Sequence, residues 1–346
     1  MKANNIKKPT LKIVAAKLGV STATVSNAFN RPDQLSAALR DKILHQCDEL
    51  GYTGPSLTAR SLRTGKTGVI GVLLADSLSF NFTDPVATEF LAGISQTLDA
   101  QHVNMLLLPS NAENYQSTQV ETIPDCFIVY GRPVDSSIIE RIQRQGKPLI
   151  TVDFTLENTP SVGIDNKKAA YDIACHALKD SRHKTLILGL RLEPSLSLSL
   201  ANFDSLYTSD ESISRCRFEG YREALAEIGH ELTTQDVWQI HHLEPESLKT
   251  ILRGALTAPD HVDVLLCMSD KIALAALDIA HELKLTIPDE LKIVGFDGIP
   301  EAKEKGLTTI SQPLSEKGKV AAQMALNLIP YESVELPFQL VNRHSS

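Results

Sequence analysis

Short apolar runs alternate with amphipathic segments of helical length from residue 68 to the end of the sequence. A chain of this kind forms parallel sheets, because each helix carries the chain back to the edge where the next parallel strand begins. The body is therefore expected to be an α/β structure with helices on both faces of its sheets. Strands are predicted at 69–74, 103–108, 127–130, 149–152, 185–188, 262–267 and 291–295, and helices at 86–100, 168–179, 217–228, 247–256 and 271–283.

The length and composition fit a folded chain of two or three domains. The sequence has 346 residues, of which 42% are hydrophobic and 22% are charged. These fractions argue against a disordered chain and against a membrane protein. No apolar run reaches the roughly 18 residues that a membrane span needs. The N-terminus is basic but no hydrophobic signal segment follows it, so a cytoplasmic location is expected.

The net charge of −8 hides a division between the two ends of the chain. Residues 1–66 contain 11 Lys and Arg against 4 Asp and Glu, a balance of +7. The remaining 280 residues contain 23 against 38, a balance of −15. A small basic head on a large acidic body suggests a module that binds a polyanion, joined to a body that a polyanion would repel.

Motifs for catalysis or for a metal are absent. The five cysteines are odd in number and contain no C-x-x-C pair, so we expect reduced, buried thiols. The pair His241-His242 has no third ligand at metal spacing, and no G-x-G-x-x-G fingerprint occurs. We therefore expect no enzyme activity, no cofactor and no metal.

The head is predicted to consist of short helices. Thr10 can cap a first helix over 11–18, and Ser21 can cap a second that runs to about Phe29. Ser36 can cap a third, with apolar residues at helical spacing. A brief helical run at 56–62 follows in a linker. The segment from about 191 to 215 is rich in serine and is expected to be either a mobile loop or part of a binding mouth.

The first two helices have the features of a helix-turn-helix. Ala15 is small where the helices would cross, and Gly19 tolerates the positive φ of a tight turn. Val25 and Ala28 would then face the first helix. The residues left outward on the second helix are short and mostly polar: Thr22, Ala23, Thr24, Ser26 and Asn27.

Motifs along almost the whole chain resemble the LacI/GalR family of bacterial transcription regulators. In the head and linker they are STATVS at 21–26 and ARSLRTG at 59–65, which follows Pro55. In the body they include Asp165-Asn166, Arg217 with Gly220-Tyr221, MSD at 268–270, VGFD at 294–297, LTTI at 307–310 with Gln312-Pro313, and the closing Leu336-Pro337 with Leu340, Val341 and Arg343. Each motif is weak alone, but the set is specific.

The resemblance implies a homodimer that places the second helix of each protomer in the major groove of a palindromic DNA operator. Thr22, Ala23 and Asn27 would then face base edges. The residues that would reach phosphates are Ser21, Thr24, Ser26 and Asn30. Many relatives carry a larger basic residue at the position of Asn27, which leaves the operator sequence open.

The resemblance also gives the linker a role on DNA. In the family the linker becomes a helix in the minor groove, where a leucine from each protomer wedges between base pairs. Leu62 matches that leucine, and Ala59 of the same linker motif is also expected to contact DNA. Ser56 stands where the family usually has Asn, a departure that still permits a helix cap.

For the body, the resemblance implies two Rossmann-like lobes, as in a periplasmic sugar-binding protein, with an effector in the cleft between them. Lobe 1 is expected at about 68–161 plus 296–320, and lobe 2 at about 162–295 plus 321–346. Carboxylates and arginine suit sugar hydroxyls, and an aromatic ring suits a sugar face. The matching residues, at strand ends or helix starts, are Phe82, Asp84, Asp153, Arg217 (expected to open a helix), Ser269, Asp270, Asp297 and Gln312.

These observations predict a helix-turn-helix domain over 1–54, a hinge over 55–67 and an effector-binding and dimerisation domain over 68–346. The expected function is ligand-controlled transcription regulation, with repression as the commonest role in the family. A sugar or polyol suits the cleft, and a nucleoside or related metabolite stays open. The alternatives are a small-molecule binding protein with no DNA role, and an α/β enzyme with an unrelated helical head.

Overall fold

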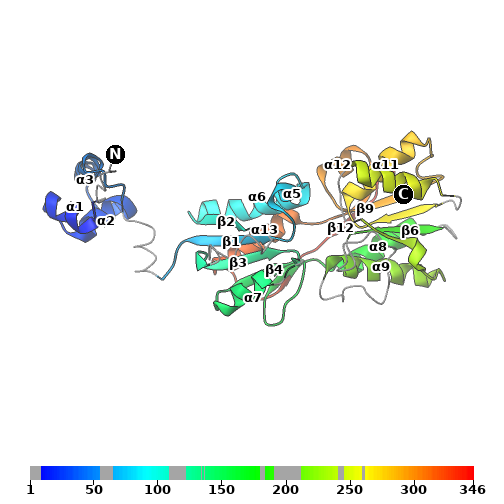
Figure 1. The fold of residues 1–346 in the computed structure, drawn as a ribbon, viewed down its shortest axis with the longest axis horizontal. Coiled ribbons are helices and arrows are strands. Elements are labelled where there is room, and N and C mark those ends of the chain that lie inside the picture. The colour runs from blue at the N-terminus through cyan, green and yellow to red at the C-terminus, as the bar shows by residue number, and fades with distance from the viewer. Residues whose placement is uncertain are drawn as a thin grey trace, which may run out of the picture. The chain divides into compact units, whose positions relative to one another are not determined.

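The computed structural model describes residues 9–54, 65–108, 122–133, 135, 137–179, 184–190, 212–240, 245–258 and 262–346. The chain divides into two compact units, residues 1–68 and 69–346 (Figure 1). Most of the predicted hinge, with Ala59 and Leu62, lies outside the described residues, as do His241-His242 and most of the predicted loop at 191–215.

The first unit is a cluster of short helices around a small apolar core. Its elements are α1 (Leu11–Leu18), α2 (Thr22–Asn30), η1 (Pro32–Gln34) and α3 (Ala37–Glu49). The core contains Val14, Ala15, Val25, Ala28, Ile43, Cys47 and Tyr52, all buried. Ala15 packs at the crossing of the first two helices, because a larger side chain there would hold them apart.

The helix ends agree with most of the predicted caps. Ser21 accepts a hydrogen bond from the backbone N–H of Thr24, and Ser36 caps α3 in the same way. Thr10 makes no side-chain cap bond, so that prediction is wrong. Gly19 has φ 66° and ends α1, the left-handed conformation that the turn requires.

The first sheet of the second unit has six strands in the order β11-β5-β4-β3-β1-β2. Its strand pairs are all parallel; β1, for example, pairs Gly71 with Leu106 of β2 and with Phe127 of β3. The strands are β1 (Val69–Leu74), β2 (Asn104–Leu108), β3 (Cys126–Tyr130), β4 (Leu149–Val152), β5 (Ser161–Gly163) and β11 (Val334–Glu335).

The second sheet also has six strands, in the order β12-β10-β9-β8-β6-β7. Its pairs are parallel except at one edge, where β12 runs antiparallel to β10. The strands are β6 (Thr185–Gly189), β7 (Val237–Gln239), β8 (Val264–Cys267), β9 (Lys292–Asp297), β10 (Thr308–Ser311) and β12 (Gln339–Val341). The expected class, a helix-turn-helix head on a body of two parallel α/β sheets, is confirmed.

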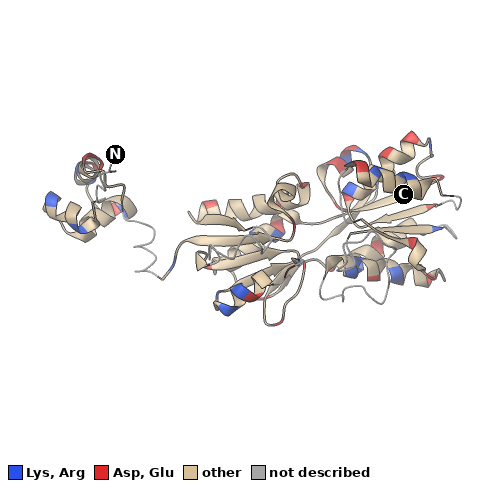
Figure 2. Ribbon diagram, in the orientation of Figure 1, with Lys and Arg blue, Asp and Glu red and all other residues tan. Residues whose placement is uncertain are grey.

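Helices cover both sheets, and charged residues lie mainly on these helices (Figure 2). The longer helices are α6 (Pro85–Ala100), α7 (Ser137–Arg144), α8 (Asn166–Ala177), α9 (Ile213–Glu227), α10 (Pro245–Leu256), α11 (Asp270–Glu282) and α13 (Leu314–Ala325). Shorter turns are α5 (Leu78–Asn81), α12 (Pro300–Glu304) and η5 (Thr234–Asp236). None of the described helices is both long and apolar enough to cross a membrane.

Helix α13 packs directly on α6 beside the first sheet. A Cβ at Gly318 of α13 would lie 2.2 Å from the backbone oxygen of Phe90, and one at Gly93 would lie 2.0 Å from that of Ser315. Two glycines therefore let the helix backbones touch. This contact fixes α13, and with it the residue before Gly318, which is Lys317.

The crossings between the two sheets differ from the expected lobe boundaries. The first sheet continues through β5 to Gly163, so the chain leaves it after residue 161. Assigning 296–311 to lobe 1 is wrong, because β9 and β10 belong to the second sheet. Assigning 321–335 to lobe 2 is also wrong, because this stretch contains the end of α13 and β11. Which sheet a segment joins depends on the strand with which it pairs. An apolar run in the sequence does not indicate that partner strand.

Candidate functional site

The residues predicted to face outward on α2 differ in exposure, and Ser26 and Asn27 among them are half-buried. Thr22 and Ala23 are exposed at the start of the helix, and Thr24 is half-buried. The hydroxyl groups of Ser21 and Thr24 lie 2.8 Å apart and satisfy each other. The start of α2 therefore presents small side chains, with two methyl groups among them, that would not obstruct close approach of another surface.

Further along α2, amide side chains are held by neighbours. Nδ2 of Asn27 donates to Oε1 of Gln34 in η1 at 3.0 Å. Nδ2 of Asn30 donates to the backbone oxygen and the hydroxyl of Ser26, at 3.0 and 3.3 Å. Gln34 was not among the predicted residues, and its contact sets the direction of the Asn27 amide.

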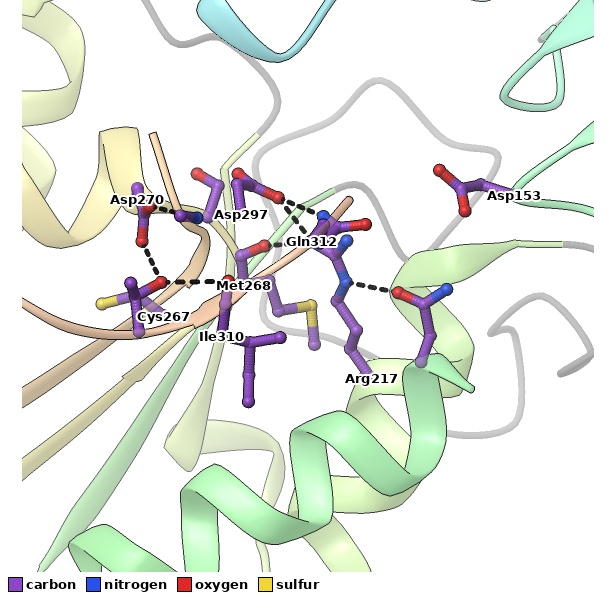
Figure 3. A network of polar contacts seen from close by, with 12 residues as sticks. Asp153, Arg217, Cys267, Met268, Asp270, Asp297, Ile310 and Gln312 are labelled. Carbon is purple, nitrogen blue, oxygen red and sulfur yellow. Dashed lines mark hydrogen bonds and ion pairs between the residues drawn. The ribbon is translucent and has the colours of Figure 1, made fainter. Parts of the chain in front are cut away.

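In the second unit, a polar cluster lies where strands from both sheets end (Figure 3). Asp153 follows β4 of the first sheet, and Asp297 ends β9 of the second. Gln312 follows β10, and its segment leads from the second sheet to α13. The carboxyl ends of parallel strands are where open α/β sheets bind ligands.

The backbone at both carboxylates is unusual. Asp153 has φ 62° and Asp297 has φ 127°, in the range that favours glycine. Such conformations cost about 1–3 kcal/mol each and are concentrated at functional sites. The cluster thus combines strained backbone with buried charge.

Arg217 is the centre of the second-sheet part of the cluster. It lies in the second turn of α9, which begins at Ile213; the expectation that Arg217 opens a helix is therefore wrong. Its Nε donates to Oδ1 of Asn166 at 3.0 Å, and its Nη1 donates to the backbone oxygen of Met268 at 2.6 Å. The guanidinium also stacks on Phe296, with 3.6 Å between Cζ and the ring centroid.

The carboxylate of Asp297 contacts Arg217 and Gln312. Nη1 of Arg217 lies 3.5 Å from Oδ1 of Asp297, and Nε2 of Gln312 donates to the same oxygen at 2.8 Å. Burial raises the pKa of Asp297 to about 8; the nearby guanidinium of Arg217 opposes this shift, and Asp270 and Asp84 add to it. The carboxyl group can therefore change charge near neutral pH.

Lys317 joins the cluster from the first-sheet side, and the sequence prediction missed it. Its Nζ lies 2.6 and 2.8 Å from the two carboxylate oxygens of Asp153 and 2.6 Å from Oε1 of Gln312. Burial lowers the pKa of Lys317, and Asp153 counteracts this effect. The available signal was helical spacing, since Lys317 stands three after Leu314 and four before Ala321, both of which are buried.

Asp84 links the two sheets at another point of the cluster. It caps α6 by accepting from the N–H of Ala87 at 3.0 Å, and its other oxygen lies 2.9 Å from Nζ of Lys271 on α11. The same ammonium lies 4.8 Å from the ring centroid of Phe80. Phe82, the predicted aromatic, is 61% exposed at the end of α5 and makes no ring contact with another described residue.

The remaining predicted residues lie beside the cluster and have contacts within the second sheet. Ser269 caps α11 by accepting from the N–H of Ile272. Asp270 accepts from the N–H groups of Gly298 and Ile299 at 2.7 and 2.9 Å, and from the hydroxyl of Thr309 at 2.5 Å. The carboxylate of Asp270 therefore fixes the turn after β9 and so the position of Asp297.

Tyr130 is a second residue that the sequence did not indicate. It ends β3, and its ring stacks on Phe90 with 4.4 Å between centroids. Burial raises its pKa, and the carboxylates of Asp153, Asp297 and Asp84 raise it further. Its hydroxyl thus lies in the electrostatic field of all three.

A cavity of about 370 Å³ adjoins Asp153. It lies among the loop after β4, the strands β5 and β11, and the starts of α8 and α9. Its polar lining residues include Thr155, Asp165, Asn166, Lys167 and Ser212. Asn166 connects this cavity to Arg217 and so to the cluster.

Comparison with protein families gives matches to both units. Residues 10–54 match the model of bacterial regulatory proteins of the lacI family. Residues 201–346 match a periplasmic binding protein-like domain.

Relatives match along the length of the chain. An HTH-type transcriptional regulator of Mycobacterium tuberculosis is 33% identical over 326 residues, which cover 92% of this chain and 91% of that protein. The crystal structure of a lacI-family transcriptional regulator from Corynebacterium glutamicum is 27% identical, with a TM-score of 0.69 over 99% of this chain and 98% of that one. The lac repressor dimer bound to operator and an anti-inducer shares the fold, at 20% identity and a TM-score of 0.72 over 98% and 99% of the two chains.

Proposed function

Because this chain belongs to the lacI family of transcriptional regulators, we propose that it binds a palindromic DNA operator as a dimer and that a small polyhydroxylated effector controls this binding. Repression is the regulatory role proposed for it. The lac repressor structure of the same fold contains a dimer on its operator, which is the assembly proposed for this chain.

The exposed start of α2 supports the DNA-binding part of the proposal. Thr22 and Ala23 are exposed and offer methyl groups for thymine, and Asn27 has an amide that can pair with adenine. In this proposal Ser21, Thr24, Ser26 and Asn30, at and along the same helix, contact phosphates. In this proposal Ala59 and Leu62 of the hinge enter the minor groove, and Leu62 is the wedge.

The observation that most supports an effector site is the polar cluster between the two sheets. It contains three ion pairs: Arg217 with Asp297, Lys317 with Asp153, and Lys271 with Asp84. The charges of the Lys317–Asp153 and Lys271–Asp84 pairs cancel, so an uncharged ligand would leave these ions balanced. Carboxylate, amide and guanidinium groups bind hydroxyls well, which favours a sugar or polyol.

The same cluster offers a route from effector to DNA. Asp153, Lys317 and Asp84 lie on elements of the first-sheet side, whereas Arg217, Asp297 and Lys271 lie on elements of the second. A ligand that hydrogen-bonds to both sets has a different binding energy for each arrangement of the sheets, and so changes their equilibrium. We propose that this change alters the spacing of the paired hinges.

The proposal is tested by a thermal-shift screen of monosaccharides, polyols, amino sugars, uronates and nucleosides, followed by operator binding with each hit. Arg217→Met should abolish the ligand-induced rise in Tm, because it removes the donor that faces Asp297. It should also lower stability, since the guanidinium's hydrogen bonds to Asn166 and Met268 and its stacking on Phe296 are lost.

Arg222→Met is the matched control, because Arg222 lies on the same helix but pairs with Glu219 at the surface. This variant should keep the full ligand response. An Arg217→Met protein that folds and still responds to the effector as the wild type does would refute the proposed site.

A further inference from the structure

The ammonium group of Lys317 has a hydrogen-bond acceptor for each of its hydrogens. A protonated lysine carries three N–H donors. The three contacts of Nζ, to both oxygens of Asp153 and to Oε1 of Gln312, are 2.6, 2.8 and 2.6 Å long. The cation is therefore a fully bonded part of the site.

The Lys317–Asp153 pair is almost completely buried, and Asp153 adjoins the cavity described above. The side chain of Lys317 is 0% exposed, and that of Asp153 is 2% exposed. When one partner of a buried pair is removed, the other remains as an uncompensated charge at a cost of several kcal/mol. Asp153 therefore requires a cation at this position, supplied either by the protein or by a ligand.

Lys317 also determines which way the amide of Gln312 points. Its ammonium can only donate, so it selects the amide oxygen of Gln312 as its partner. The amide nitrogen then faces Asp297 and donates to it at 2.8 Å. Through Gln312, one lysine of the first-sheet side thus orients a donor toward a carboxylate of the second sheet.

The other bases of the cluster already have carboxylate partners. Arg217 pairs with Asp297 at 3.5 Å, and Lys271 pairs with Asp84 at 2.9 Å. A ligand ammonium that approached Asp153 would meet the cation of Lys317 there. Each of the three carboxylates, Asp153, Asp297 and Asp84, already has a base beside it. A ligand hydroxyl carries no charge and can still donate to the lone pairs of Asp153 that Lys317 does not use.

We propose that Lys317 is a specificity-determining residue of the effector site: it holds the cationic position against Asp153, so the site accepts neutral polyhydroxylated ligands and rejects their amino counterparts. This inference rests on the effector site proposed above. Lys317 was not among the residues that the sequence indicated, and its charge makes a neutral ligand the preferred one.

The test compares ligands that differ in one substituent. Full-length wild type and Lys317→Met are titrated calorimetrically with glucose, glucosamine and glucuronate, and with the corresponding galactose and mannose series. The wild type should bind a neutral member at least about tenfold more tightly than its amino counterpart. Lys317→Met lacks the ammonium but keeps most of the aliphatic stem, and its preference should shift by about tenfold or more toward the amine, which replaces the missing cation.

Two further variants separate specificity from folding. Lys319→Met changes an exposed lysine on the same helix, which lies 3.7 Å from Glu316, and should keep the wild-type preference. Lys317→Met combined with Asp153→Asn removes both charges, so it should fold even if the single variant does not. It should lose discrimination between neutral and amino ligands without gaining affinity for the amine.

The outcomes distinguish this inference from the proposed function. Unchanged preference in Lys317→Met, full discrimination in the double variant, or a wild-type preference for an amino or acidic ligand would each overturn the role of Lys317 while leaving the effector site in place. A wild type that responds to no member of the wider screen would contradict the effector site itself.

Discussion

Asp153 and Asp297 have the same combination of features, although they end strands of different sheets. Each carries a positive φ, each is nearly buried, and each has a cation within 3.5 Å. A strained backbone persists where the surrounding contacts determine it. Here those contacts come from Lys317 for one carboxylate, and from Gln312 and Arg217 for the other. At the scale of single residues, the site is held in place by its own polar contacts.

Asp297 should make the stability of the folded protein depend on pH, and the Asp297→Asn variant should lack this dependence. Burial raises the folded-state pKa to about 8 from an ordinary value of 3.8, so the folded protein binds this proton more tightly than the unfolded chain does. The stabilisation is complete below pH 4 and is lost as the pH rises toward 8. Asp297→Asn should therefore gain Tm relative to the wild type between pH 5 and pH 8. Parallel Tm profiles of the two proteins over this range would show that the titration does not occur.

The sequence indicated the individual carboxylates better than their partners. Asp153 and Asp297 follow short, mainly apolar segments, Leu-Ile-Thr-Val and Ile-Val-Gly-Phe, so their places at strand ends could be predicted. Lys317 could not be assigned, because a lysine on a helix is usually solvated and this one is buried against Asp153 and Gln312, which are distant in the sequence or lie on another element. The prediction that a helix begins at Arg217 is wrong by four residues, because α9 begins at Ile213 with Ser212 as its cap.

At the scale of elements, long apolar runs were located well and short strands were missed. β5, β7, β11 and β12 have two or three residues each, which is too few for a periodic signal, and the four-residue β10 (Thr308–Ser311) was not predicted either. Their positions depend on pairing with a neighbouring strand, as β11 pairs with β5 across 172 residues of sequence between Val334 and Val162. The predicted lobe boundaries were wrong because they depend on this pairing between distant strands.

The turn between α1 and α2 offers a test of one element. At Gly19, φ is 66° and an added Cβ would meet nothing within 4 Å, so Gly19→Ala acts through backbone strain alone. It should lower the stability of the first unit by about 1 kcal/mol. Gly254→Ala within α10 also adds a Cβ in open space but without positive φ, and should raise stability by about 0.5–1 kcal/mol. Calorimetry of both variants measures the two changes in stability. If Gly19→Ala and Gly254→Ala changed stability equally, Gly19 would not have the role assigned to it.

At the scale of the whole molecule, the division of charge matches the division of the chain. The basic residues 1–66 end two residues before the boundary between the compact units at Gly68. The acidic remainder carries the polar cluster and has a balance of −15. DNA should therefore attract the first unit and repel the second, which favours contact through α2.

DNA binding is tested most directly by selection from a randomised duplex library with the full-length protein, followed by anisotropy titration of the selected DNA over a range of salt concentrations. The account predicts enrichment of an inverted repeat and an affinity that falls linearly on a log–log plot as salt rises, because phosphate contacts release counterions. Thr22→Glu, on the exposed start of α2, should abolish this binding. Selected sequences without inverted symmetry, or an affinity indifferent to both salt and Thr22→Glu, would contradict the account.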